Sequence, residues 1–276
     1  MSKRSIESLG LIGAGNMGSA LIRGACDSLL VEPKNVWIYD PDTEKTAALA
    51  RDPGVRVASS GVQVLANAGT ILLAVKPQIL VDVLKELGPA EQKDQVFISV
   101  AAGIPTALIE KHLGERAIVI RAMPNTPAML GKGATAVAGG TRATMHNMAN
   151  AQVLFGAVGL AVSVEEEQMN AVTGLSGSGP AYVFRMIEAL TQAGIAAGLG
   201  RQVADNLARQ TVLGAATMAS DLESDPAELR RRVTSPGGTT EAGLKVLDEA
   251  GFMELIERVV LRARDRGQEL GKALED

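Results

Sequence analysis

Up to Val164, the chain alternates short apolar runs with longer helix-like stretches, and this alternation restricts the fold more than any other feature. The apolar runs are mostly continuous, as expected of strands that are covered on both faces. Strands that alternate with helices form parallel sheets, because each crossover helix returns the chain to the same end of the sheet. The runs that predict strands are 8–13, 35–40, 54–59, 70–75, 95–100 and 116–123, then 135–140 and 159–164 around a helix-like stretch at 142–155. The sequence therefore predicts an α/β fold with a doubly wound, mostly parallel sheet.

From Glu165 onward the strand pattern disappears, and the remaining segments carry helical periodicity. These segments are 179–200, 201–222, 225–233 and 240–275. We place a boundary at this change and expect an α/β domain at 1–164 and an all-helical domain at 165–276. The helix expected at 179–198 is apolar around most of its circumference, so one covering layer would leave part of it exposed. We therefore expect the helical domain to bind a second copy of the chain.

The loop after the first strand carries the sequence GAGNMG at 13–18. In such a loop the first glycine permits a tight turn, the second lets a pyrophosphate approach the backbone, and the third lets helix and strand pack closely. A glycine-rich turn in another α/β protein would share the glycines. This loop, however, follows a strand, opens a helix and precedes an acidic residue at the end of the next strand. It predicts a Rossmann-type dinucleotide-binding domain, with Gly13, Gly15, Asn16, Met17, Gly18 and Asp40 at the cofactor.

Asp40 bears on the choice between NADH and NADPH. A carboxylate at this position accepts hydrogen bonds from the ribose 2′-OH of NAD and repels a 2′-phosphate. Asp40 is also a good turn former between strand and helix, and the two roles are compatible. Lys45 and Arg51 follow in the next helix, and either side chain could reach a 2′-phosphate. We expect NADPH or NADH as the cofactor, with NADH usable because of Asp40.

Composition excludes several classes of function. A net charge of −4 argues against nucleic acid or an anionic membrane as the main partner. No apolar run approaches the roughly 20 residues of a membrane-spanning helix. The single cysteine, Cys26, excludes an intrachain disulfide and fits a reducing compartment, so we expect a cytoplasmic protein. Two distant histidines and one cysteine have no metal-site spacing, so no metal is expected.

The segment GLSGSGPAYVF at 174–184 bears on the reaction. It resembles the GxxGxGxxxK segment of the β-hydroxyacid dehydrogenases, in which the terminal lysine is the catalytic acid. Gly174, Gly177 and Gly179 match that spacing, but Val183 stands at the lysine position. A substrate without an alkoxide to protonate would explain the missing acid. Imines are such substrates, because hydride addition to a protonated imine yields a neutral amine.

Five segments, in order along the chain, resemble the pyrroline-5-carboxylate reductase family. They are LLAVKPQ (72–78), SVAAGI (99–104), IRAMPNTPAMLGKG (120–133), GLSGSGPAYVF and VTSPGGTTEAGLKVL (233–247). The resemblance covers nearly the whole chain and implies reduction of the cyclic imine 1-pyrroline-5-carboxylate to L-proline by NAD(P)H, the last step of proline biosynthesis. It also implies a homodimer of interlocked helical domains and allows higher assembly, such as a decamer. Two alternatives stay open: a related reductase of a hydroxyacid or another cyclic imine, and a nicotinamide-binding protein without turnover.

The resemblance also implies roles for single residues. The substrate carboxylate is expected at the SPGGTT loop, where the glycines leave the backbone accessible and a helix N-terminus favours an anion. Thr240 is the expected catalytic residue, with its hydroxyl directed at the imine nitrogen. The expected substrate-binding residues are Glu223, Ser235, Gly237, Gly238, Thr239 and Thr240, and the further cofactor-binding residues are Val75, Lys76, Pro77 and Asn125. Without the neighbouring motifs, SPGGTT would be interpreted as a plain helix cap.

Overall fold

The computed structural model describes residues 6–90, 94–221, 223 and 225–272, which fall in two compact units. The first unit runs to Ser178 and includes the stretch from Leu261 onward, and the second is Gly179–Val260. None of the helices in this part of the chain combines the length and the apolarity that crossing a membrane requires.

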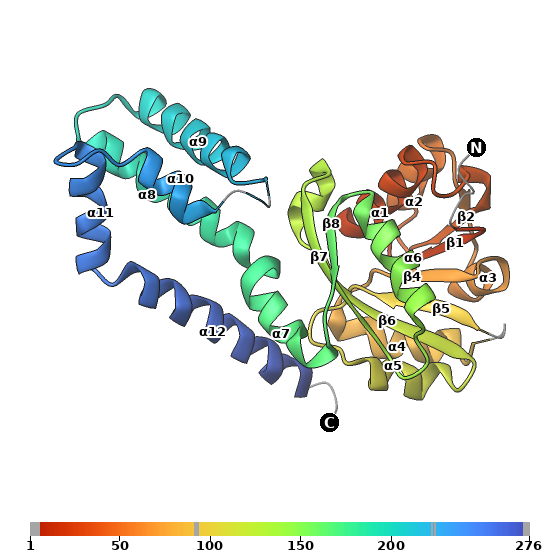
Figure 1. Ribbon diagram of the computed structural model, residues 1–276. Helices are drawn as coiled ribbons and strands as arrows, with labels where there is room; N and C mark the ends of the chain where they lie inside the picture. Colours follow the sequence, from red (N-terminus) through yellow and green to blue (C-terminus); the bar gives the residue numbers. More distant parts are fainter. Residues whose placement is uncertain (1–5, 91–93, 222, 224, 273–276) are drawn as a thin grey trace. The chain divides into compact units, whose positions relative to one another are not determined.

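One eight-stranded sheet forms the centre of the first unit (Figure 1). Its strands are β1 (Leu9–Ile12), β2 (Val36–Tyr39), β3 (Arg56–Val57), β4 (Thr70–Leu73), β5 (Gln95–Ser99), β6 (Ala117–Met123), β7 (Gly133–Gly139) and β8 (Gly159–Ser163). They lie in the order β3-β2-β1-β4-β5-β6-β7-β8, and every neighbouring pair is parallel except β6 and β7. The predicted strands and the predicted mostly parallel sheet are confirmed.

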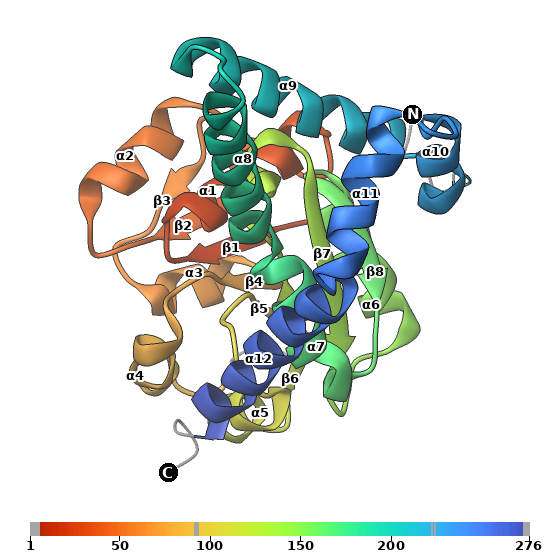
Figure 2. The same cartoon turned by 90° about the vertical axis from the view of Figure 1, so that its left-hand side faces the viewer.

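Helices cover both faces of this sheet, as expected of a doubly wound fold (Figure 2). Helices α1 (Asn16–Asp27), α2 (Thr43–Arg51) and α6 (Met145–Gly156) share one buried cluster with Leu9 and Leu11 of β1. Helices α3 (Gly61–Asn67), α4 (Pro77–Leu87) and α5 (Thr106–Leu113) share the other with Ile12. Two short 3-10 helices, η1 (Pro33–Asn35) and η2 (Thr126–Leu130), complete the connections. Successive side chains of β1 therefore point to opposite faces of the sheet and pack into two separate hydrophobic cores.

The second unit is helical, as predicted. It contains α8 (Gly179–Ala196), α9 (Arg201–Met218), α10 (Pro226–Arg232), α11 (Thr239–Glu249) and the first part of α12 (Phe252–Lys272). The segment expected to be helical over 240–275 is interrupted after Glu249, since Gly251 adopts a left-handed φ of +65°. Such a glycine commonly ends a helix. The C-terminal helical stretch is therefore two helices.

This helical unit has few buried residues of its own. Within its described residues, only Thr191, Ala204 and Ala208 are buried. Large apolar side chains are instead exposed along its helices, among them Phe184, Leu213, Val246 and Met253. A chain segment with so little buried apolar surface gains too little from its own packing to be stable alone.

The compact units differ from the predicted division at Val164. That residue follows the end of β8, but η3 (Glu166–Gln168), α7 (Met169–Val172) and a π-helical turn at Thr173–Gly177 still belong with the sheet. Met169 is buried against Ala136 and Ala138 of β7. The last turns of α12 belong there too, because a Cβ on Gly271 would lie 2.6 Å from the carbonyl oxygen of Gly103. Helical periodicity reports that a segment is helical, not which surface it packs against.

Candidate active site

The glycine loop joins β1 to α1 at the carboxyl end of the sheet. Gly13 has a φ of +99°, and a Cβ there would lie 2.6 Å from the carbonyl oxygen of Ala74. A Cβ on Gly18 would lie 2.3 Å from the oxygen of Gly13, so both positions require glycine for packing alone. A Cβ on Gly15 would meet nothing within 4 Å. The middle glycine therefore faces open space, and this is the position at which a dinucleotide loop brings its backbone close to the pyrophosphate.

Helix α1 begins at Asn16 directly after this loop, and its N-cap, Gly15, offers no side chain to the first N–H groups. These groups and the helix dipole favour a bound anion. The described residues thus fit a dinucleotide at the point where the sequence predicted one.

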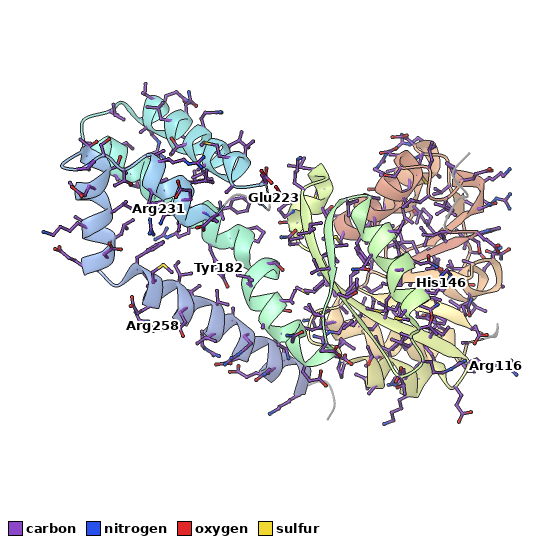
Figure 3. All side chains as sticks on the ribbon, in the orientation of Figure 1. Arg116, His146, Tyr182, Glu223, Arg231 and Arg258 are labelled. Carbon is purple, nitrogen blue, oxygen red and sulfur yellow. The ribbon has the colours of Figure 1, made fainter. Side chains whose placement is uncertain are left out.

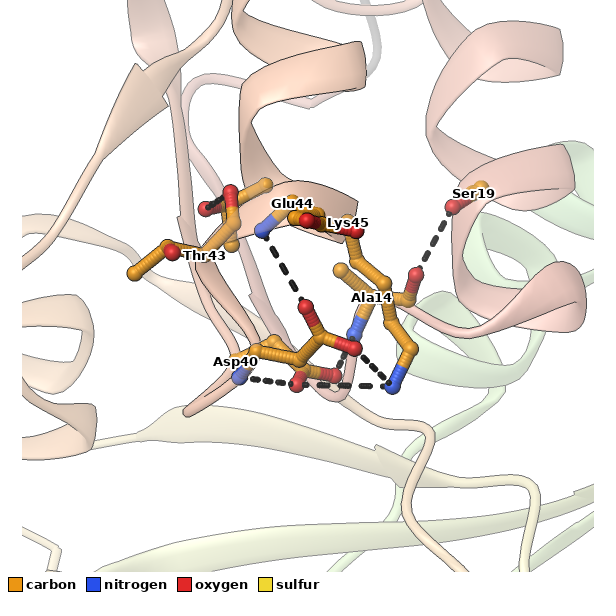
Figure 4. Close-up of polar contacts among 8 residues, drawn as sticks. Ala14, Ser19, Asp40, Thr43, Glu44 and Lys45 are labelled. Carbon is orange, nitrogen blue, oxygen red and sulfur yellow. Dashed lines mark hydrogen bonds and ion pairs between the residues drawn. The ribbon is translucent and has the colours of Figure 1, made fainter.

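Asp40 connects the end of β2 to the glycine loop (Figure 4). The N–H of Ala14 donates to its Oδ2 at 2.8 Å, and the N–H of Asp42 donates to its Oδ1 at 2.9 Å. Asp42 in turn caps α2 by accepting from the N–H of Glu44. Asp40 is therefore a turn former, as the alternative interpretation held, and the same contacts hold its carboxylate beside the loop.

A cavity of about 520 Å³ opens beside the glycine loop. Its lining includes Gly13, Gly15, Asp40, Lys45, Val75 and Lys76. Lys76 is the N-cap of α4, and Pro77 is the first residue of that helix. Five of the residues expected at the cofactor, from three separate stretches of the chain, thus line one cavity: Gly13, Gly15, Asp40, Val75 and Lys76.

Asn125 has a different environment. Its side-chain N–H donates to the carbonyl oxygen of Ser176 at 3.0 Å, and its Oδ1 accepts from the N–H of Ala134 at 2.9 Å. The side chain is nearly buried and does not line the cavity. It joins the start of β7 to the π-helical turn, and its expected contact with the cofactor stays a prediction.

The SPGGTT loop lies in the helical unit, between α10 and α11. Gly237 adopts a left-handed φ of +68°, and Gly238 is the N-cap of α11. The N–H of Gly238 donates to the oxygen of Ser235, which closes the turn. Thr239 and Thr240 are the first two residues of the helix, and their side chains are exposed. The loop therefore places helix-terminal N–H groups and hydroxyls at one exposed point, as an anion site requires.

Glu241 is a residue of this loop that sequence reasoning missed. Its Oε2 accepts the N–H of Gly237 at 2.7 Å. It lies three residues after the N-cap, where an acidic side chain commonly folds back on a helix start. That spacing was the available signal, and it identifies Glu241 as the group that holds Gly237 in place.

Glu223 precedes α10 and is exposed (Figure 3). Its N–H donates to Oδ1 of Asp221 at 3.1 Å, which forms a local turn. Its expected role in ordering the substrate pocket stays a prediction. Val183 lies on α8 and is partly exposed.

Within the described residues, no three His, Cys, Asp or Glu side chains form a group that could hold a metal ion. Cys26 is buried, and burial raises the pKa of its thiol to about 11. The thiol therefore stays protonated at neutral pH and is not a nucleophile.

An open parallel sheet, a glycine loop at the end of β1, an acidic residue at the end of β2 and a cavity between them define a class of protein. The chain is a Rossmann-type oxidoreductase with a helical C-terminal domain. Residues 8–103 match the family described as NADP oxidoreductase coenzyme F420-dependent, and residues 166–270 match the family described as pyrroline-5-carboxylate reductase dimerisation.

Full-length relatives identify the family. The chain is 42% identical over 271 residues to a pyrroline-5-carboxylate reductase of Pseudomonas aeruginosa, covering 98% of this chain and 99% of the relative. A solved pyrroline-5-carboxylate reductase of Coxiella burnetii is 37% identical and superimposes with a TM-score of 0.90 over 95% of this chain and 98% of that one. A Plasmodium falciparum pyrroline carboxylate reductase with NADP bound is 28% identical, with a TM-score of 0.82 over 97% and 99% of the two chains. The chain belongs to the pyrroline-5-carboxylate reductase family, which confirms the resemblance seen in its motifs.

Proposed function

We propose that this chain reduces 1-pyrroline-5-carboxylate to L-proline with a reduced nicotinamide cofactor. The observation that carries the proposal is the 42% identity to a pyrroline-5-carboxylate reductase over 98% of the chain. The cavity beside the glycine loop supports it, because its lining fits a dinucleotide. A nicotinamide-binding protein without turnover would have no need of the SPGGTT loop.

The residues around the cavity would bind the nicotinamide cofactor and orient it. Gly15 would leave room for the pyrophosphate, the start of α1 would stabilise its charge, and Asp40 would accept a hydrogen bond from the adenosine ribose. Val75 and Lys76 line the same cavity. The bound nicotinamide would supply the hydride.

On the substrate side, the chain's residues hold a small anion. The Ser235 hydroxyl and the N–H groups of Thr239 and Thr240 would bind the carboxylate of the imine, because the start of α11 favours negative charge. Gly237 and Gly238 would shape the turn and leave space for the carboxylate, since their own N–H groups donate to Glu241 and to Ser235. Thr240 would accept a hydrogen bond from the N–H of the protonated imine through its hydroxyl oxygen. Hydride addition to the protonated imine would turn the ring CH of the C=N bond into the Cδ methylene of proline and leave a neutral secondary amine, so no alkoxide forms. A strong acid at the position of Val183 is therefore unnecessary.

We infer in addition that the chain works as a homodimer in the cytoplasm, with higher assembly such as a decamer as the further possibility implied by the family. The match to a dimerisation family over 166–270 supports self-association, and the exposed apolar side chains of the helical unit supply the surface for it. A single buried thiol fits a reducing compartment.

The test is direct. Purified protein is mixed with NADPH or NADH and 1-pyrroline-5-carboxylate, while nicotinamide oxidation and proline formation are followed together. We expect equal amounts of oxidised cofactor and proline, and no oxidation without the imine. The six-membered imine piperideine-6-carboxylate and a hydroxyacid pair are run in parallel. If the chain reduced either of these compounds in preference to the five-membered imine, the proposed substrate would be wrong. If it bound the cofactor and the imine without turnover, the proposal that it is an enzyme would be wrong.

A further inference from the structure

The loop after β6 lies at the edge of the sheet where a dinucleotide is expected. The strand order β3-β2-β1-β4-β5-β6 is that of a dinucleotide-binding fold built from two halves, and the ligand lies across the point between β1 and β4 where the order reverses. Asp40, after β2, belongs to the half expected to hold the adenosine. The nicotinamide half is therefore expected over the ends of β4, β5 and β6, and Asn125 is the second residue after β6.

Asn125 uses its side-chain amide for two hydrogen bonds, both to backbone groups. Its Nδ2–H donates to the carbonyl oxygen of Ser176 at 3.0 Å, and its Oδ1 accepts from the N–H of Ala134 at 2.9 Å. The residue is only 9% exposed, so water replaces neither bond easily. One amide therefore ties together the loop after β6, the start of β7 and the π-helical turn at Thr173–Gly177.

The carbonyl of Ser176 needs a donor from outside its own helix. In an α-helix it would accept from the N–H four residues further on, but Pro180 stands there and has no N–H. The turn is π-helical, with the N–H of Ser178 donating to the oxygen of Thr173 at 2.9 Å. Such turns are frequent at functional sites. The amide of Asn125 thus satisfies a carbonyl that Pro180 leaves without its usual partner.

A second contact holds the same turn. A Cβ on Gly177 would lie 2.6 Å from Cε of Met123, so the last side chain of β6 packs directly on the bare backbone of this glycine. Val172, just before the turn, packs in the same small cluster as Met123. The turn is therefore fixed by an apolar contact, which many side chains could make, and by one directional hydrogen bond, which requires a donor at Asn125.

We propose that Asn125 is a positioning residue, which acts through the π-helical turn and does not contact the cofactor. Its amide donor holds the Ser176 carbonyl and so fixes the turn against the loop after β6. A rigid wall at this edge keeps the nicotinamide ring in the orientation that hydride transfer needs, because small misplacements of reacting groups cost rate. The role therefore concerns kcat and not the affinity for the cofactor. The inference rests on the proposed function for its kinetic test alone.

Two substitutions separate the donor from the shape of the side chain. Asn125→Asp keeps an oxygen for the N–H of Ala134 but donates only when it is protonated. Burial raises the pKa of such a carboxyl group, and the ionised form repels the Ser176 carbonyl. The activity of this variant, relative to the natural chain at the same pH, should be lowest at high pH and recover as the pH falls through the raised pKa. Asn125→Leu has a similar shape without either hydrogen bond, so it should not recover.

Steady-state kinetics with the imine and saturating NADPH are compared at about pH 8 and about pH 5.5, and calorimetry measures the Kd for NADPH. At the higher pH both variants are expected to lower kcat about tenfold, since a buried carbonyl loses its donor. Only Asn125→Asp should regain most of this loss at the lower pH. The Kd for NADPH should stay within about twofold in both variants. Asn67→Asp is the matched control and should change neither quantity, since Asn67 is exposed and donates to the oxygen of Gln63 within α3.

Hydrogen exchange of the backbone amides, measured without substrate, tests the contact itself. Both variants should exchange faster over 173–178 and at an unchanged rate in α6. Weaker NADPH binding with an unchanged kcat would overturn the proposal and make Asn125 a direct cofactor contact. Unchanged exchange in the turn, or no recovery of Asn125→Asp at the lower pH, would overturn the role of the amide donor.

Circular dichroism at each pH verifies folding, and if Asn125→Leu fails to fold, Asn125→Asp carries the comparison between its two protonation states. A natural chain that does not reduce the imine would refute the proposed function. In that case faster exchange in the turn would still support the contact between Asn125 and Ser176, so the two failures can be told apart.

Discussion

Thr239 and Thr240 are adjacent at the start of α11, but the chemistry proposed for them differs. Thr239 is expected to act through its backbone N–H, while Thr240 is expected to direct its hydroxyl at the imine nitrogen. A substitution by valine keeps the shape and the β-branching of threonine and removes only the hydroxyl. Comparing Thr239→Val with Thr240→Val therefore shows which hydroxyl the reaction needs, because both variants keep the backbone N–H groups of the loop.

Thr240→Val is expected to lower kcat/KM for the imine by roughly tenfold to a hundredfold. The physical reason is the loss of one hydrogen bond to a charged partner, about 1.5–3 kcal/mol, where 1.36 kcal/mol corresponds to tenfold. Steady-state kinetics and a separate measurement of NADPH affinity check it, and the affinity should not change. Thr239→Val is the control and should lose much less. A loss confined to Thr239→Val would move the role to the other hydroxyl, and no loss in either would make SPGGTT a helix cap.

At the scale of elements, Glu166 joins three parts of the first unit. Its carboxylate accepts from the N–H and the hydroxyl of Thr106, the first residue of α5, whose N-cap Pro105 has no side-chain acceptor. It also lies 3.5 Å from a guanidinium nitrogen of Arg121 on β6, whose side chain is 6% exposed. Burial lowers the pKa of Arg121, and the Glu166 charge opposes that shift. One carboxylate thus caps a helix and balances a buried cation at the point where the chain leaves the sheet.

Glu166→Ala is expected to destabilise the protein by about 3 kcal/mol, because it leaves a buried charge without its partner and a helix start without its cap. Thermal or urea unfolding followed by circular dichroism measures the change. Glu167→Ala is the matched control, since that side chain is exposed, and a shift within about 0.5 kcal/mol is expected. Equal effects of the two substitutions would show that the Glu166 contacts add no stability.

At the scale of the whole molecule, the scarcity of buried residues in Gly179–Val260 makes association a condition of stability. Light scattering is expected to find dimers or larger assemblies, and no stable active monomer, at working dilution. Phe184→Glu is expected to weaken the assembly and reduce activity with it, because the side chain is 60% exposed on α8 and a charge there opposes burial between chains. Met145→Glu, at a side chain 92% exposed on α6 in the first unit, serves as the control and should leave both unchanged. A fully active monomer would contradict the proposed dimer.

The strands, most of the helices, the doubly wound sheet and the family could all be predicted from the amino-acid sequence, whereas the break of the last helical stretch at Gly251 could not. Apolar periodicity reports directly which residues are buried in a strand or helix, and the glycines at 13 and 18 are required by backbone contacts that recur with the motif. Which residues come together across long separations in the chain is visible only in the folded structure. Lys45 lines the cavity beside the glycine loop, whereas Arg51 does not. The side-chain amide of Asn125 hydrogen-bonds to the backbone of Ala134 and Ser176. The end of α12 packs on Gly103. Side-chain direction and the choice of packing surface depend on contacts between distant segments, and local sequence patterns carry no record of those contacts.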